Sequence, residues 1–310
     1  MIGTKYSSEN TGRAGGWKNG LESRGNLAFV IVLLLLMWGC TETIDMELKS
    51  TNRRLVVDGM LTNEEKMHYI RLSESVPFFQ DSASPVVSDA EVIISDGDRI
   101  ERLHEASEMP GFYLTSQDFA GVPGRNYTLT VRGVDIDDDG QTETYRASST
   151  MPEPNQADSI DVVYDEKWDI WKVLLYATDN PDKRDYYMFR VFRNGGLISD
   201  NITEFSLASD QFFDGNRAAG VWVQSIDASN ENHPMEPGDV ITLQMCTIGE
   251  AYYNFIDGVQ RENRQQYPLF SGPPANAPGN VNCDALGFFP AFSVSYASFL
   301  FDEETIREQE

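Results

Sequence analysis

Alternating aspartates form the sharpest chemical motif of this 310-residue chain. Asp135, Asp137 and Asp139 stand at every second position, and a glycine follows them. Carboxylates at this spacing surround a calcium ion in EF-hand-like loops, where the glycine permits the turn. Gln141 would add a backbone carbonyl, and Glu143 a carboxylate bound directly or through water. These five residues are the candidate calcium ligands.

The same segment has a plainer interpretation. Where an EF-hand has a bidentate glutamate at the twelfth position, this chain has Arg146. The segment also lies between two predicted strands, over 126–132 and 145–151, so it can be an acidic hairpin turn without a metal. Both alternatives stay open, and no cofactor other than calcium is indicated.

Cys40 is the second candidate for chemistry. Twelve apolar residues run without a break from Leu27 to Trp38, and Gly39 and Cys40 follow them. A helix that spans a bilayer needs about 18 or more apolar residues, whereas this length suits a secretory signal. Gly39-Cys40 resembles the lipobox of bacterial lipoproteins, in which the signal is cut before the cysteine and lipid is attached to it. Trp38 departs from that pattern, because the lipobox has small residues near the cleaved bond.

The sequence therefore predicts a signal peptide over 1–39 and a lipidated tether over 40–53, with a plain signal anchor as the alternative. The net charge of −25 excludes binding to nucleic acid, because the surface would repel the phosphates. An acidic surface would also not adhere to an anionic leaflet, so acyl chains on Cys40 would have to hold the protein at the membrane.

The other cysteines and a group of phenylalanines are weaker candidates. Cys246 and Cys283 can pair in an oxidising compartment or stay as unpaired buried thiols. Phe288, Phe289 and Phe292 follow a loop rich in proline and glycine and form a candidate patch for a partner.

Catalytic constellations are missing from the sequence. The three histidines, His68, His104 and His233, lie far apart, and no nucleophile elbow or phosphate-binding glycine loop occurs. We therefore predict a protein that is not an enzyme. A carboxylate-based glycan hydrolase stays open as an alternative, because 49 acidic residues offer many pairs.

Alternation of apolar and polar residues predicts a mainly β protein. Between residues 54 and 152 it indicates strands over 55–59, 68–73, 90–95, 111–114, 126–132 and 145–151. Short strands at this density, separated by turn residues, are typical of an Ig-like or Greek-key β-sandwich. Pro152 and Pro154 then mark a boundary, because proline ends a strand.

A second β-rich domain is predicted over 153–310. Its expected strands cover 159–164, 171–177, 186–192, 221–226 and 240–248, with a last strand or hairpin over 288–301. Tyr252, Phe255, Ile256 and Val259 have helical spacing, which predicts one amphipathic helix over 249–266 near the C-terminus.

Several short blocks, in this order, resemble a family of Bacteroidetes outer-membrane lipoproteins described as a domain of unknown function, DUF4249. The blocks cover Gly39-Cys40 and the ranges 55–62, 69–73, 90–94, 111–113, 124–129, 268–274 and 285–289. The family supplies no catalytic residues. Its members are found near TonB-dependent receptors, so the resemblance implies an accessory or ligand-binding role in nutrient uptake, on the periplasmic or cell-surface face of the outer membrane. A surface adhesin or structural protein is the third alternative.

Overall fold

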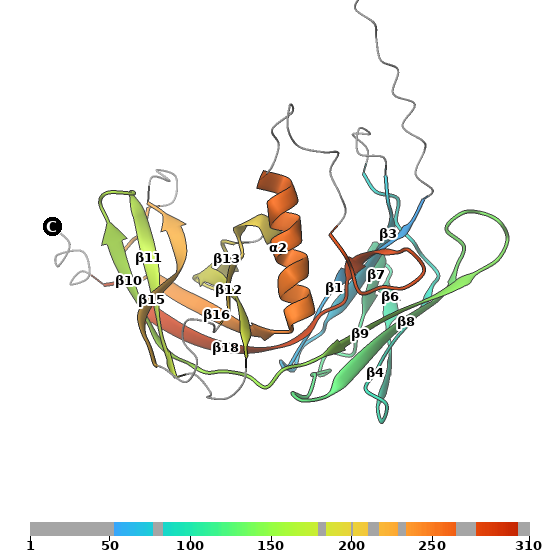
Figure 1. The fold of residues 1–310 in the computed structure, drawn as a ribbon, viewed down its shortest axis with the longest axis horizontal. Helices are drawn as coiled ribbons and strands as arrows, with labels where there is room; N and C mark the ends of the chain where they lie inside the picture. Colours follow the sequence, from blue (N-terminus) through green and yellow to red (C-terminus); the bar gives the residue numbers. More distant parts are fainter. Residues whose placement is uncertain are drawn as a thin grey trace, which may run out of the picture. The chain divides into compact units, whose positions relative to one another are not determined.

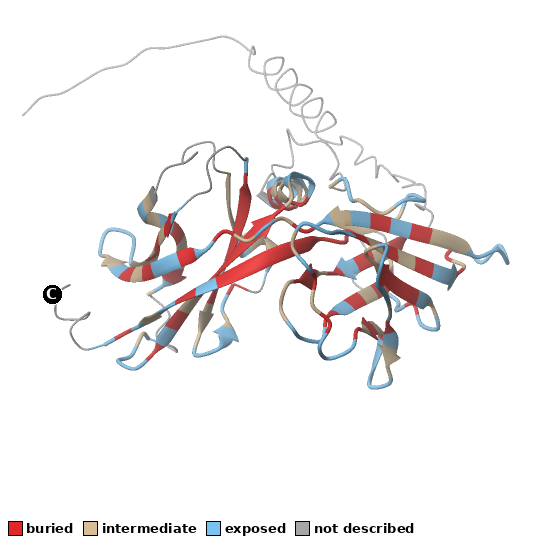
Figure 2. Ribbon diagram, turned by 90° about the horizontal axis from the view of Figure 1, so that it is seen from below, coloured by how far each residue is buried: buried red, intermediate tan, exposed pale blue. Residues whose placement is uncertain are grey.

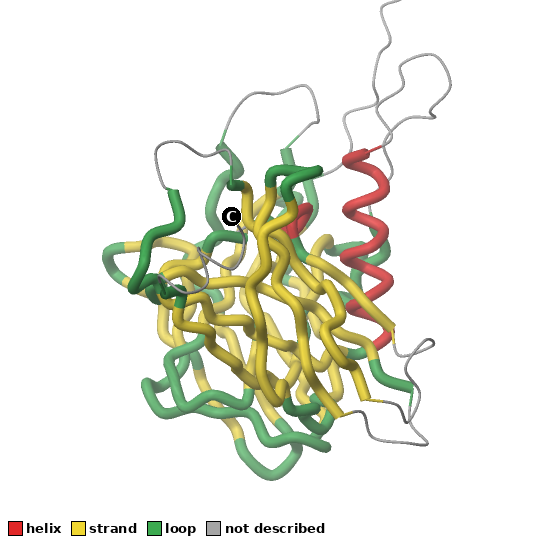
Figure 3. Tube along the Cα trace, turned by 90° about the vertical axis from the view of Figure 1, so that its left-hand side faces the viewer, coloured by secondary structure: helices red, strands yellow, loops and turns green. Residues whose placement is uncertain are grey.

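The computed structural model describes residues 53–76, 83–178, 184–199, 201–209, 217–228, 234–264 and 277–302. These residues all belong to one compact unit, Thr51–Glu310. The predicted signal peptide and Cys40 lie outside the described residues. Within these ranges strands dominate, and α2 (Glu250–Arg264) is the one α-helix (Figure 3). None of the described helices has the length and apolar character that crossing a membrane requires.

A first sandwich is built mostly from residues before Met151 (Figure 1). One sheet has the order β17-β1-β3-β7-β6 and the other β5-β4-β8-β9. Their bounds are β1 (Leu55–Gly59), β3 (Tyr69–Glu74), β4 (Glu91–Ser95), β5 (Ile100–Arg102), β6 (His104–Ala106), β7 (Met109–Leu114), β8 (Asn126–Val134), β9 (Glu143–Thr150) and β17 (Leu286–Phe288). Side chains from both sheets form one buried core, which includes Leu72 and Leu129.

The alternation predicted from the sequence decides which side chains enter this core. On β8, Tyr127, Leu129 and Val131 are buried, whereas the threonines between them are only half-buried. Figure 2 shows buried and less buried positions alternating along the strands. Full burial of an aliphatic side chain stabilises a fold by about 1.5–3 kcal/mol. A shift of the strand pairing by one residue would turn these side chains to the opposite face, so it is strongly disfavoured. The mainly β prediction is confirmed.

A second pair of sheets follows Met151. The orders are β10-β11-β15 and β13-β12-β16-β18-β2, and β14 also pairs with β12. Their bounds are β2 (Leu61–Thr62), β10 (Ala157–Asp165), β11 (Ile170–Thr178), β12 (Tyr186–Arg193), β13 (Gly196–Leu197), β14 (Ser206–Ser209), β15 (Arg217–Asp227), β16 (Val240–Ile248) and β18 (Ala291–Leu300), with a short 3-10 helix η1 (Ile202–Glu204). A second buried core contains Val173 and Leu243 from facing sheets.

Two parallel strand pairs connect residues on the two sides of the predicted boundary. β1 pairs with β17, and β2 pairs with β18. Gly287 allows the first pairing: its φ is +93°, and a Cβ there would lie 2.0 Å from the Val57 carbonyl oxygen. The ranges 54–152 and 153–310 therefore describe most strands, but the contacts join them into one unit.

Helix α2 confirms the predicted amphipathic helix and covers a third apolar cluster. Its Tyr252 and Ile256 pack against Met188 and Cys246 of the six-stranded sheet. The Tyr252 ring centroid lies 5.2 Å from that of Phe288 and 6.1 Å from that of Phe292. The helix thus closes an apolar sheet face that would otherwise meet water.

Two sequence-based expectations fail because of this packing. Phe288, Phe289 and Phe292 are only 7 %, 0 % and 0 % exposed, so the predicted partner patch is wrong: the chain turns these rings into the cores. Cys246 and Cys283 are both free thiols, so of the two alternatives the disulfide is wrong, and the unpaired thiols differ from expectation only in that Cys283 is exposed. Burial raises the pKa of the Cys246 thiol to about 12, which makes it inert.

Phe292→Ala tests the cluster beneath α2. Phe292 is completely buried, so we expect the free energy of unfolding in urea to fall by about 3–5 kcal/mol, through lost burial and the cavity that remains. Leu300→Ala on the same strand is the control, because Leu300 is 60 % exposed and should change stability by less than about 0.5 kcal/mol. Similar losses in both variants would contradict this packing.

Candidate functional site

The acidic motif occupies the loop that joins β8 to β9. The two strands pair up to Val134 and Glu143, so the loop covers the residues between them. Asp138 has a left-handed φ of +58°, as does Gly140 at +84°, which aspartate and glycine tolerate best. Asp138 also forms an ion pair with Arg53, ahead of β1. The pairing of β8 with β9 thus fixes both ends of the loop. The backbone conformation within the loop then sets where the aspartate side chains lie.

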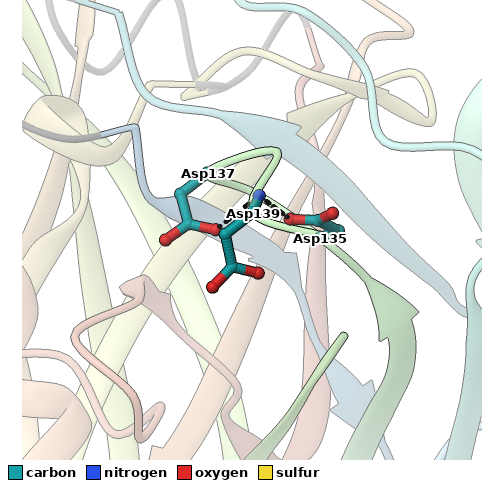
Figure 4. A group of neighbouring side chains, drawn as sticks. All are labelled: Asp135, Asp137 and Asp139. Carbon is teal, nitrogen blue, oxygen red and sulfur yellow. Dashed lines mark hydrogen bonds between the residues drawn. The ribbon is translucent and has the colours of Figure 1, made fainter. Parts of the chain in front are cut away.

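Three of the five predicted ligands come together (Figure 4). One carboxylate oxygen each from Asp135, Asp137 and Asp139 lies within 4.8 Å of the other two. Calcium–oxygen bonds are about 2.3–2.6 Å long, so two oxygens on one ion stand at most about 5 Å apart. The spacing therefore fits a single calcium ion. Asp135 is half-buried, whereas Asp137 and Asp139 are exposed.

Glu143 is not part of this group of carboxylates, and the backbone carbonyl of Gln141 stays a predicted ligand. The Gln141 side chain donates to Asp139 Oδ2 at 3.3 Å, and Glu143 accepts a hydrogen bond of 3.4 Å from the Tyr145 hydroxyl. Burial, followed by the charge of Glu143, raises the pKa of Tyr145 to about 12. Glu143 is thus held at the start of β9 by a neutral phenol.

The aspartates also close the turn without any ion. The Asp139 backbone N–H donates to Asp135 Oδ1 at 3.2 Å, and the Gly140 N–H donates to Asp135 Oδ2 at 2.9 Å. Such bonds between a carboxylate and nearby backbone groups are what make aspartate a turn residue. The acidic turn is therefore stable without a metal ion. Calcium would bind the carboxylate lone pairs that do not accept hydrogen bonds from backbone N–H groups.

The two described histidines have unlike surroundings. His68 is 3 % exposed, and its Nε2 accepts a hydrogen bond of 3.1 Å from the Thr62 N–H. Burial lowers the pKa of His68 to about 4, so the ring is neutral at pH 7. His104 is exposed on β6, and His233 lies outside the described residues. His68 is therefore a structural residue that joins the start of β3 to β2.

The sequence does not reveal a second group of polar side chains, which borders the apolar cluster that α2 covers. It contains Arg71 and Arg190, more than a hundred residues apart. Neither residue belongs to a motif with known spacing, and only the pairing of the strands brings them to neighbouring sheets. No signal in a single sequence could have found it.

Calorimetry with calcium distinguishes the two interpretations of the acidic loop. Three carboxylates on one loop predict a weak site, with a dissociation constant of about 0.1–1 mM. Asp137→Asn should weaken binding by about tenfold, since it removes one charge and keeps the side chain's shape. Asp98→Asn, in another exposed turn, is the control. Absence of heat and of any shift in melting temperature with the unaltered protein would leave the metal-free turn.

His68 should make the fold sensitive to acid. Its pKa in the folded state lies below its ordinary value, so between about pH 6.5 and 4 the unfolded chain binds a proton that the folded chain refuses. Stability should fall over this range by up to about 3 kcal/mol. In His68→Gln this fall, measured by urea unfolding at pH 7 and pH 4.5, should shrink. His104→Gln should retain it, and an unchanged fall in His68→Gln would refute the assignment.

Comparison with known proteins gives one result. No curated protein is detectably similar in sequence. A family model described as "Domain of unknown function (DUF4249)" matches residues 41–297. That range covers most of the chain and nearly all of the described strands. The chain therefore belongs to the DUF4249 family.

Proposed function

We propose that the protein is a lipid-anchored envelope protein that acts as a non-enzymatic accessory or ligand-binding partner of a TonB-dependent outer-membrane receptor in nutrient uptake. The observation that carries this proposal is the apolar segment that ends at Gly39-Cys40. The family match begins at residue 41, directly after this cysteine. Acylation of Cys40 would thus leave the whole matched region beyond the anchor.

The tether supports a role close to the membrane. The chain between Cys40 and β1 would reach at most about 50 Å when fully extended. The protein's acidic surface gains nothing from an anionic leaflet, so the acyl chains supply the attachment. Such an anchor holds the folded part near membrane receptors and leaves it free to turn.

The non-enzymatic part of the proposal rests on how the candidate groups are used. His68 is a neutral core residue, and the three aspartates bind the backbone of their own exposed loop. The partner is inferred from the family resemblance, in which members are found near TonB-dependent receptors. No contact among the described residues favours the hydrolase or the adhesin alternative.

Mass spectrometry of the protein purified from membranes tests the anchor. We expect a mature N-terminus at Cys40 carrying acyl chains, and we expect Cys40→Ser to abolish acylation and to leave residues 1–39 attached to the chain. Cys283→Ser is the matched control, because it removes an exposed thiol far along the chain and should leave lipidation intact. An unmodified Cys40 in a freely soluble protein would overturn the anchor.

Affinity capture from detergent-solubilised envelopes tests the partner. The acylated protein should co-purify with a β-barrel receptor, and Cys40→Ser should recover less of it because the unprocessed form lacks the acyl anchor that concentrates it beside the receptor. Capture of no receptor by a fully acylated protein would rule out the accessory role while leaving the anchor in place.

A further inference from the structure

Two half-buried arginines, Arg71 and Arg190, form no ion pair among the described residues. Among the described carboxylates, none lies at ion-pair distance from Arg71 on β3 or Arg190 on β12. The Nε atom of each is buried and has no hydrogen-bond partner. A buried N–H without an acceptor is unfavourable. The chain has a net charge of −25, so it holds many carboxylates that could have accepted from these N–H groups. Asp58 stands beside Arg71 and acts on it by charge, but neither guanidinium is held in an ion pair.

Aromatic rings hold both guanidinium groups in place. Arg71 Cζ lies 5.6 Å from the ring centroid of Phe112, and Arg190 Cζ lies 5.5 Å from that of Phe205. Arg190 also donates one hydrogen bond, of 3.3 Å, to Gln244 Oε1. Stacking of this kind fixes the plane of a guanidinium and leaves its N–H edge available to an acceptor. The groups are thus positioned before any ligand arrives.

The strand register places these side chains in two neighbouring rows. In the first sheet Asp58, Arg71 and Phe112 stand side by side on β1, β3 and β7. In the six-stranded sheet Arg190 stands beside Gln244, and Gln244 stands beside Tyr296. The Gln244 side-chain amide donates a hydrogen bond of 2.6 Å to the Tyr296 hydroxyl. The chain passes from β1 to β2, and so from one sheet to the other, within two residues.

Packing brings both arginines to the apolar cluster that α2 covers. Phe205, on which Arg190 stacks, packs against this cluster, and Phe288 of the cluster stands beside Asp58, the neighbour of Arg71. Burial and the charge of Asp58 raise the pKa of Tyr69, whereas the charges of Arg190 and Arg71 act to lower it, in keeping with this packing. Tyr69 is 39 % exposed, so the cluster can be reached from solvent.

We propose that Arg71, Arg190 and the Tyr69 hydroxyl bind an oxyanion, either a carboxylate or a phosphate group of a small ligand, beside the apolar cluster that α2 covers. Guanidinium groups are the side chains best suited to these anions, because their N–H groups match two oxygens at once. Asp58 lies beside Arg71 and opposes the ligand's charge, which keeps the affinity moderate. The site does not depend on the proposed envelope function.

Calorimetry at constant ionic strength with three probes tests this site. We expect the protein to bind galacturonate, inorganic phosphate or both, and not to bind galactose, which has the same ring as galacturonate without the carboxylate. Binding of galacturonate alone identifies a carboxylate ligand, and binding of phosphate alone identifies a phosphate ligand. Absence of heat with both anions up to about 10 mM would overturn the proposal.

Substitutions test where the anion binds, because they should change its affinity in opposite directions. Arg71→Gln and Arg190→Gln should each weaken anion binding by about tenfold or more. The control Arg102→Gln removes an exposed arginine paired with Glu91 and should leave binding unchanged. Asp58→Asn should tighten binding severalfold, because it removes a negative charge beside Arg71.

The Asp58 variant keeps the test decisive if an arginine variant fails to fold. Asp58 is exposed, so its replacement by asparagine should preserve the fold. Arginines that only stack on phenylalanine rings would give no tightening in Asp58→Asn. Unchanged binding in that variant, or equal binding in Arg71→Gln and Arg102→Gln, would refute the site.

Discussion

Backbone pairing between the start and the end of the described chain is the constraint on which the other features depend. β1 lies beside β17, and β2 beside β18, both in parallel register. Their hydrogen bonds bring residues near 57 against residues near 287, where only a glycine fits. The same crossing carries the chain from one sheet to the next, so it sets the orientation of both sheets. Helix α2, the buried phenylalanines and the arginine cluster all lie along it.

The acidic composition has a structural use beyond solubility. Asp96 accepts hydrogen bonds from the backbone N–H groups of Asp98 and Arg99 and from the Arg125 side chain. Burial raises the pKa of Asp96, but these bonds outweigh it and the pKa is lowered overall. Asp239, directly before β16, is used similarly: it accepts hydrogen bonds from the Glu236 N–H and from the Asn194 side chain in the turn between β12 and β13. Aspartates that close turns are therefore a general device of this chain, and the loop over 135–139 is one more instance with three carboxylates in place of one.

The arginines of this acidic protein have two kinds of surroundings. Several, such as Arg102 and Arg132, meet a carboxylate on the surface, where such pairs add little stability. Arg71 and Arg190 instead stack on aromatic rings, where partial burial strengthens any charge interaction. The surrounding negative surface would repel anions in general, so an oxyanion reaching this cluster would be selected by contact with the two guanidinium groups rather than by long-range attraction.

The sequence by itself determined the local structure: the strand alternation, the helix over 250–264 and the acidic loop all follow from neighbouring residues along the chain. Local periodicity carries that information because each side chain's direction is set by its own strand or helix. Tertiary structure alone decided the rest. Whether Phe292 is a core or a surface residue, whether Cys246 meets Cys283, and whether Arg71 shares a site with Arg190 depend on which distant strands pair. Those pairings join residues more than two hundred positions apart, and no local pattern records them.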